Sequence, residues 1–160
     1  MARGHDVESI GVAAAQLLAS GAVGDPQLRV AARVGVALPV MRPEGTQHSW
    51  FVPLTVGESL VAFMQILADG TLLRFSSFQR RPGDPGGCPP AADWLDAANI
   101  RRRAQAQRID SKAGEPVLTF DKNPDRLVWC VPLTDAHGKT RQIYVAGTTI
   151  YEPTPSGGIG

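Results

Sequence analysis

The feature that most constrains this chain is a six-residue segment that occurs twice. Residues 50–55 read WFVPLT and residues 129–134 read WCVPLT, so five of six positions agree between copies that lie 79 residues apart (Trp50 and Trp129). Shorter matches flank both copies in the same order: Pro39-Val40-Met41 with Pro116-Val117-Leu118, and Ala68-Asp69-Gly70-Thr71-Leu72 with Ala146-Gly147-Thr148-Thr149-Ile150. Three matching blocks in one order indicate an internal duplication.

The first half is expected to contain a helix followed by strands. Residues 6–20 carry an apolar stripe with the spacing of one helix face, and Asp6 and Gly21 suit its two ends. Residues 27–36 fit either a short helix or a strand. Apolar runs separated by turn residues then predict four strands: Val36–Met41, Ser49–Thr55, Leu60–Leu67 and Thr71–Ser76.

The second half repeats this element order after a break. Residues 79–92 hold four prolines and three glycines, which predicts a linker. A helix is expected next, with Asp93 as its N-cap and Ala97, Ile100 and Ala104 on one side. Further strands are predicted at Pro116–Phe120, Arg126–Leu133, Thr140–Ala146 and Thr148–Glu152. The domains are therefore 1–78, a linker 79–92, a second repeat 93–152 and a disordered tail 153–160.

The fold class that follows is α+β, with two helix-plus-antiparallel-sheet repeats related by a pseudo-twofold and sharing a core. Strand alternation places Trp50, Val52 and Leu54 in the core, and likewise Trp129, Val131 and Leu133, together with Leu17 and Ile100 from the helices. Proline cannot donate a hydrogen bond to a neighbouring strand. Pro53 and Pro132 therefore fit an edge strand, a strand end or a bulge, and a proline at the same place in both copies favours a position of both WxVPLT strands near a sheet edge.

The second half resembles a PepSY-type domain, a small helix-plus-antiparallel-sheet module. The similarity rests on residues 117–131, on Asp135 to Gly138 and on Ile143 to Tyr151, and it reaches the first half only through the repeat. The acidic residue and Thr-Gly that usually end the third strand of that module are here Ala146-Gly147-Thr148-Thr149. The resemblance implies a non-catalytic role, such as peptidase inhibition or assistance in peptidase folding, usually outside the cytoplasm.

Composition excludes some classes of protein. The net charge of +1 argues against a nucleic-acid binder, and no apolar run reaches the roughly 20 residues of a membrane span. Cys88 and Cys130 are too few for a disulfide framework, and whether they pair stays open. The compartment also stays open: cytoplasmic if the chain is complete, secreted or periplasmic if it is a trimmed mature form.

The sequence offers no recognisable catalytic or metal-binding motif. His5, His48 and His137 stand apart from each other and from the cysteines, so we expect neither a metal site nor a catalytic triad. A glycine-rich phosphate loop is also absent from the sequence, and no cofactor is expected. Catalysis is therefore the less favoured interpretation.

The function predicted is that of a non-catalytic binding or regulatory protein acting on a peptide or protein partner, with a homodimer as one form of such pairing. Binding would use the sheet surface or edge, through outward side chains on the strands: Phe51, Arg74, Arg141 and Tyr144. The alternative is a small biosynthetic enzyme or ligand carrier with a pocket between sheet and helices.

Overall fold

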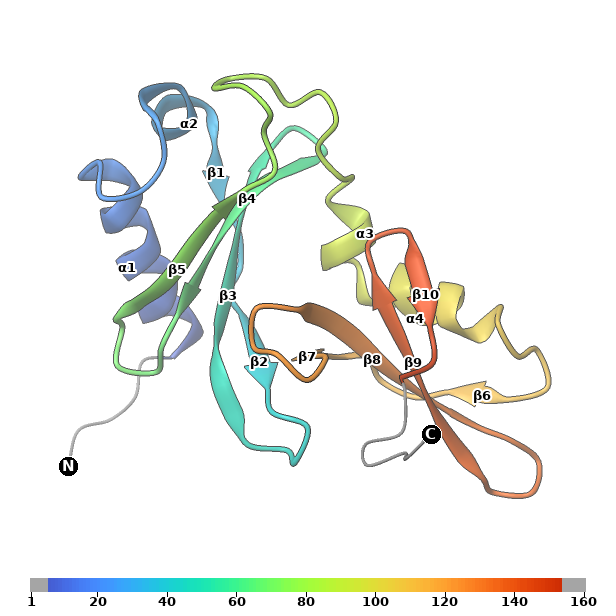
Figure 1. Ribbon diagram of the computed structural model, residues 1–160. Coiled ribbons are helices and arrows are strands. Elements are labelled where there is room, and N and C mark those ends of the chain that lie inside the picture. The colour runs from blue at the N-terminus through green and yellow to red at the C-terminus, as the bar shows by residue number, and fades with distance from the viewer. Residues whose placement is uncertain (1–5, 154–160) are drawn as a thin grey trace. The chain divides into compact units, whose positions relative to one another are not determined.

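The computed structural model describes residues 6–153, which form two compact units that divide between Ala91 and Ala92 (Figure 1). Each unit combines helices with one antiparallel sheet, so the α+β class is confirmed. His5 and the predicted tail beyond Pro153 lie outside the described residues. The units are called unit 1 (the part up to Ala91) and unit 2 (the part from Ala92).

Unit 1 places five strands in one sheet, in the order β1-β3-β4-β5, with β2 pairing β3 on the same side as β1. The segment that fitted either a helix or a strand holds one of each, α2 and β1. Asp6 caps the first helix by accepting a hydrogen bond from the Ser9 amide at 2.8 Å. The elements are α1 Val7–Ala19, α2 Pro26–Ala31, β1 Arg33–Val34, β2 Leu38–Met41, β3 Gln47–Val56, β4 Ser59–Ile66 and β5 Leu72–Ser77.

Unit 2 has the sheet order β10-β9-β8-β6, with β7 pairing β8 on the same side as β6. The helix start predicted at Asp93 is wrong for the longer helix. Asp93 lies in a one-turn helix, and Asp96 caps the longer one by accepting from the Asn99 amide at 3.2 Å. The elements are α3 Ala92–Leu95, α4 Ala97–Gln105, β6 Lys112–Ala113, β7 Val117–Phe120, β8 Leu127–Thr134, β9 Thr140–Ala146 and β10 Thr149–Tyr151.

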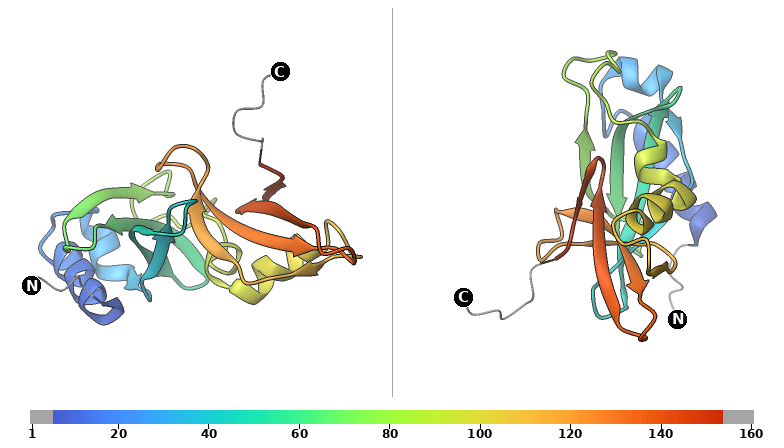
Figure 2. Two further views of the ribbon diagram at one scale, coloured as in Figure 1. Left: turned by 90° about the horizontal axis from the view of Figure 1, so that it is seen from below. Right: turned by 90° about the vertical axis from the view of Figure 1, so that its right-hand side faces the viewer.

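Each unit covers one face of its sheet with helices (Figure 2). Helix α1 contacts β1, β3 and β4, and helix α4 contacts β6, β8 and β9. The six alternating residues of the two WxVPLT strands are buried as predicted: Trp50, Val52, Leu54, Trp129, Val131 and Leu133. Ile100 is buried too, whereas Leu17 is only partly buried, because it lies on the side of α1 that borders open space.

The pairing register of one sheet recurs in the other, 79 residues later. Leu38 pairs with Phe51 and Val117 with Cys130; Val52 pairs with Met64 and Val131 with Ile143. The helices also correspond, with a displacement of 90 residues. The caps are Asp6 and Asp96, and the fully buried positions one turn apart are Ile10 and Ala14 in α1, Ile100 and Ala104 in α4.

The prolines do not mark sheet edges, so that prediction is wrong. Strand β3 lies between β4 on one side and β1 with β2 on the other, and β8 is placed likewise. The proline is tolerated because the strand opposite it is interrupted. Between β1 and β2 the chain has one more residue than the facing part of β3, as it does between β6 and β7, which is the arrangement of a β-bulge.

A glycine faces each proline across this interruption. Gly35 donates its amide to the Pro53 carbonyl at 2.9 Å, and Gly114 donates to the Pro132 carbonyl at 2.8 Å. A Cβ on either glycine would lie 2.8 Å from Cγ of the facing proline ring, which is closer than atoms tolerate. The absence of a side chain on the glycine therefore lets the proline ring enter the middle of the sheet.

The C-terminal end of the segment predicted as a linker pairs with the sheet of unit 1. Leu60 donates its amide to the Pro89 carbonyl at 2.9 Å, and Ala91 donates to the Glu58 carbonyl at 2.7 Å. Residues 89–91 therefore pair with the start of β4, which fixes the end of this segment within unit 1.

We predict that Gly35→Ala lowers the free energy of unfolding by about 1–3 kcal/mol, because the new methyl group overlaps the proline ring. Pro53→Ala removes that ring, so the double variant should recover part of the loss. Urea denaturation of the single and double variants measures this coupling, and Gly114→Ala with Pro132→Ala repeats it in unit 2. Gly11→Ala is the control, since a Cβ there meets nothing within 4 Å. Additive effects of the two substitutions would contradict the contact.

Candidate functional site

The ring of Phe51, predicted as an outward binding residue, is buried in unit 1. Phe51 is 2% exposed and its ring stacks on that of Phe63 at 4.8 Å between centroids. Phe63 also contacts the ring of Phe78 at 5.9 Å. Alternation correctly placed Phe51 on the face opposite Trp50, but this position is part of a packed aromatic cluster rather than of an accessible surface.

Arg74, the second predicted residue, belongs to a chain of polar side chains beside these rings. Its guanidinium carbon lies 5.0 Å from the centroid of Phe63, and its Nε donates to Gln65 Oε1 at 2.8 Å. Gln65 Nε2 donates in turn to Ser49 Oγ at 2.8 Å. Both Gln65 and Ser49 are fully buried, so these bonds satisfy polar groups that would otherwise be costly to bury.

His48 is partly buried, and its Nδ1 lies 2.9 Å from Ser49 Oγ. Neighbouring strand residues normally point to opposite faces, but the register shift between β2 and β3 at this point redirects the His48 side chain. Burial and the nearby charge of Arg42 lower the pKa of His48. Ser49 has no exposed surface, so a substrate cannot reach its hydroxyl.

Tyr144 and Arg141, the two predicted residues of unit 2, do not share a face of their sheet. Tyr144 pairs with Cys130, on the face opposite Trp129, and its ring meets that of Tyr151 edge-on at 5.6 Å. Tyr151 donates its hydroxyl to Asp121 Oδ2 at 2.7 Å, and burial together with this bond raises the pKa of Tyr151 to about 12. Arg141 pairs with Leu133, on the face that carries the core residues Trp129 and Val131, and forms an ion pair with Glu152 at 3.7 Å.

Both cysteines are free thiols. Cys130 donates its thiol to Gln142 Oε1 at 2.8 Å, and burial raises its pKa to about 11. Cys88 packs partly buried against the core of unit 1, where burial also raises its pKa. Since the thiolate is the reactive form, neither environment activates a nucleophile.

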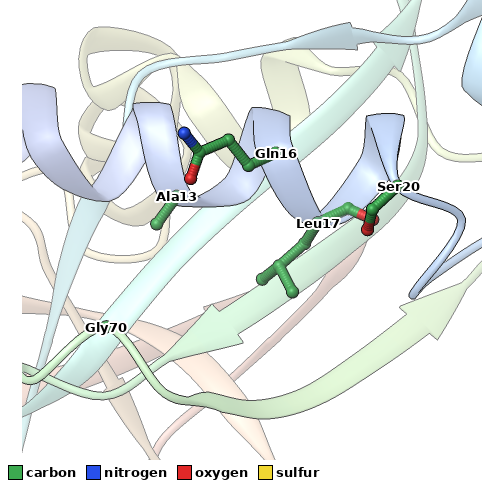
Figure 3. Close-up of a pocket in the computed structure, with 5 residues that line it drawn as sticks. All are labelled: Ala13, Gln16, Leu17, Ser20 and Gly70. Atoms are coloured by element: carbon green, nitrogen blue, oxygen red, sulfur yellow. The ribbon is translucent and has the colours of Figure 1, made fainter.

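An open pocket of 320 Å³ lies between α1 and the turn that joins β4 to β5. Figure 3 shows Ala13 and Leu17 extending from α1 toward the strands, with Gly70 in the turn facing them. The helix residues recur at the spacing of one helix face, and the lining is completed by the side chains of Gln16 and Ser20. Sequence reasoning missed this site, because residues such as Ala13, Leu17 and Gly70 carry no chemical signature.

Strand β5 follows the turn whose Gly70 lines this pocket, and it is the last strand of its sheet. Phe78 donates its amide to the Val61 carbonyl at 2.8 Å, which fixes the alternation of hydrogen bonds along the strand. The N–H groups of Phe75 and Ser77 therefore point away from β4. Leu73 is the extra residue of a register shift between β4 and β5, and its side chain is 44% exposed. Backbone groups of this kind can accept a further strand.

A second open pocket, of 300 Å³, lies in unit 2 beside the contact between Gly114 and Pro132. Two of its polar side chains, Arg101 and Glu115, are already engaged. Arg101 donates to the Ala113 carbonyl at 2.9 Å and to Glu115 Oε1 at 3.1 Å. Its lining is Arg101, Lys112, Ala113, Gly114, Glu115, Pro132 and Thr134.

Within residues 6–153, no three His, Cys, Asp or Glu side chains come close enough together to hold a metal ion. None of the helices in this range is both long enough and apolar enough to cross a membrane. No family model, curated protein or solved structure matches the chain.

We predict that Phe51→Ala lowers the free energy of unfolding by about 3–5 kcal/mol, because it empties a packed aromatic site. Chemical denaturation of the full chain measures the loss. Leu73→Ala, at an exposed position of β5, is the control and should change stability little. A Phe51→Ala variant as stable as the parent chain would show that the ring is accessible, as a binding residue requires.

Proposed function

We propose that this protein is a non-catalytic binding or regulatory protein that holds an extended segment of a peptide or protein partner along β5. The observation that carries the proposal is the position of β5, which ends its sheet and follows the turn whose Gly70 lines the open pocket under α1. A partner strand added here would gain backbone hydrogen bonds from β5 and place alternate side chains toward the pocket. Affinity would come from the backbone and specificity from the pocket.

Strand β5 suits this role better than β10, which ends the sheet of unit 2. β5 has six residues, whereas β10 has three. The residue after β10, Glu152, is also held by Arg108 at 2.8 Å and by Arg141 at 3.7 Å. A partner strand on β5 therefore gains more hydrogen bonds than one on β10. A second copy of the chain, paired along β5, is the homodimer form of the same interaction.

The relation between the units is part of the same proposal. We infer that they arose by duplication and are related by a pseudo-twofold, supported by the recurrence of register and of helix caps. The resemblance of unit 2 to PepSY-type domains stays a prediction; it favours a partner that is a peptide or a peptidase. The small enzyme or ligand carrier remains the alternative, for which the pocket under α1 would be the site.

We predict that Leu73→Lys weakens peptide binding about tenfold, because a charged side chain on an edge strand discourages strand addition. Random dodecapeptides displayed on phage are selected against the immobilised full chain, and enriched peptides are resynthesised for calorimetry. Val30→Lys is the matched control, since Val30 is exposed on α2. Amide hydrogen exchange of Phe75 and Ser77 should slow when the peptide binds.

Two results would contradict strand addition on β5. Equal affinity of the parent chain and Leu73→Lys is one. The other is a peptide that slows amide hydrogen exchange elsewhere in the chain but not at Phe75 and Ser77. Protection of these amides without peptide, in a chain that light scattering shows to be dimeric, would assign β5 to the homodimer instead.

A further inference from the structure

In unit 1 a pocket separates α1 from the β4–β5 turn, whereas in unit 2 an arginine connects α4 to the corresponding turn. Arg103 extends from α4 and its Nη2 donates to the carbonyl of Gly147, in the turn that joins β9 to β10. Its Nη1 lies 3.7 Å from Asp93 Oδ1, which balances the charge. The Trp94 indole packs close to Gly147: a Cβ on this glycine would lie 3.3 Å from the indole Nε1.

Ala13 is the counterpart of Arg103 in unit 1. Both residues directly precede the second fully buried helix residue, Ala14 in α1 and Ala104 in α4, and both lie seven residues after the capping aspartate. The two helices contact corresponding strands of their sheets. Ala13 lines the pocket together with Gly70, which lies in the turn between the last two strands, as Gly147 does in unit 2.

We propose that the pocket under α1 binds the side chain of an arginine supplied by the partner. The guanidinium would donate to carbonyl oxygens of the β4–β5 turn, as Arg103 donates to Gly147 in unit 2. This inference rests on the proposed function, because it names the side chain that a strand along β5 would place in the pocket. It specifies the partner as an arginine-containing peptide.

The lining of the pocket suits a guanidinium. Gln16 and Ser20 border it with oxygen atoms. Leu17 offers an apolar wall for the methylene groups of the arginine side chain. The planar guanidinium directs several N–H donors outward in fixed directions, whereas the lysine ammonium is a compact and strongly hydrated charge. The site should therefore distinguish arginine from lysine.

The test uses the ¹⁵N-labelled full chain and Nα-acetyl-L-arginine amide as the probe. We expect saturable shifts of the backbone amides of Ala13, Leu17 and Gly70. Nα-acetyl-L-lysine amide should bind more weakly by a factor of about five or more, because it lacks the planar donor set. Nα-acetyl-L-citrulline amide, which is planar but uncharged, should also bind more weakly.

Substitutions in α1 and α4 locate the site. Ala13→Arg should abolish binding of the probe, because the new side chain occupies the pocket as Arg103 does in unit 2. Ala15→Arg places the same side chain at an exposed position of α1 and should leave binding unchanged. Arg103→Ala should create a second site, visible as new shifts of the Gly147 amide. If Ala13→Arg does not fold, Ala13→Leu fills the pocket without new donors and should also abolish binding.

Absence of saturable shifts at Ala13 and Gly70, or equal binding of the lysine and arginine probes, would overturn the proposal. So would unchanged binding in a folded Ala13→Arg variant. The proposed function fails separately. Selected peptides that bind away from β5 while the arginine probe still shifts Gly70 would refute strand addition alone. Peptides that bind along β5 without any arginine preference would refute the arginine site alone.

Discussion

The contact between a glycine and a proline in the middle of each sheet is the constraint on which both units depend. Proline lacks the N–H that a central strand must donate, so the strand facing Pro53 has to be interrupted there. Gly35 forms that interruption, donates to the Pro53 carbonyl at 2.9 Å and leaves room for the ring. Two short strands, β1 and β2, result where an uninterrupted sheet would have one. Gly114 and Pro132 impose the same division on β6 and β7.

The helix packed over each sheet is anchored by the same few groups, and this makes the difference between the units informative. An aspartate caps α1 and α4, and an isoleucine and an alanine one turn apart are fully buried against the strands. Against these equivalent positions, one difference between the helices is conspicuous: unit 2 has an arginine where unit 1 has an alanine. Arg103 spans from α4 to the neighbouring turn in unit 2, whereas Ala13 leaves a 320 Å³ pocket in unit 1.

Local patterns predicted the elements of the fold better than they predicted the site. Alternation placed Trp50 and Trp129 in the core, and the turn signals located the strands to within a few residues. Pro53 allowed an edge, a strand end or a bulge; the favoured edge position was wrong and the bulge is found, because the glycine that makes room for the ring is distant in the sequence. Phe51 showed a second limit: alternation gives the face of a side chain but not how far that face is covered. The pocket was not predicted, because Ala13 and Gly70 are distinctive only in comparison with Arg103 and Gly147. That comparison requires the two helices to be aligned by their caps.

The most direct test of the correspondence between the units is a crystal structure of the Ala13→Arg variant. If Ala13 and Arg103 are equivalent, the new guanidinium should lie within about 2.7–3.2 Å of a carbonyl oxygen in the turn between β4 and β5. The backbone of α1 and of that turn should be unchanged, and the pocket should be filled. A side chain that extends into solvent, with the pocket still open, would contradict the equivalence and with it the assignment of the pocket to an arginine.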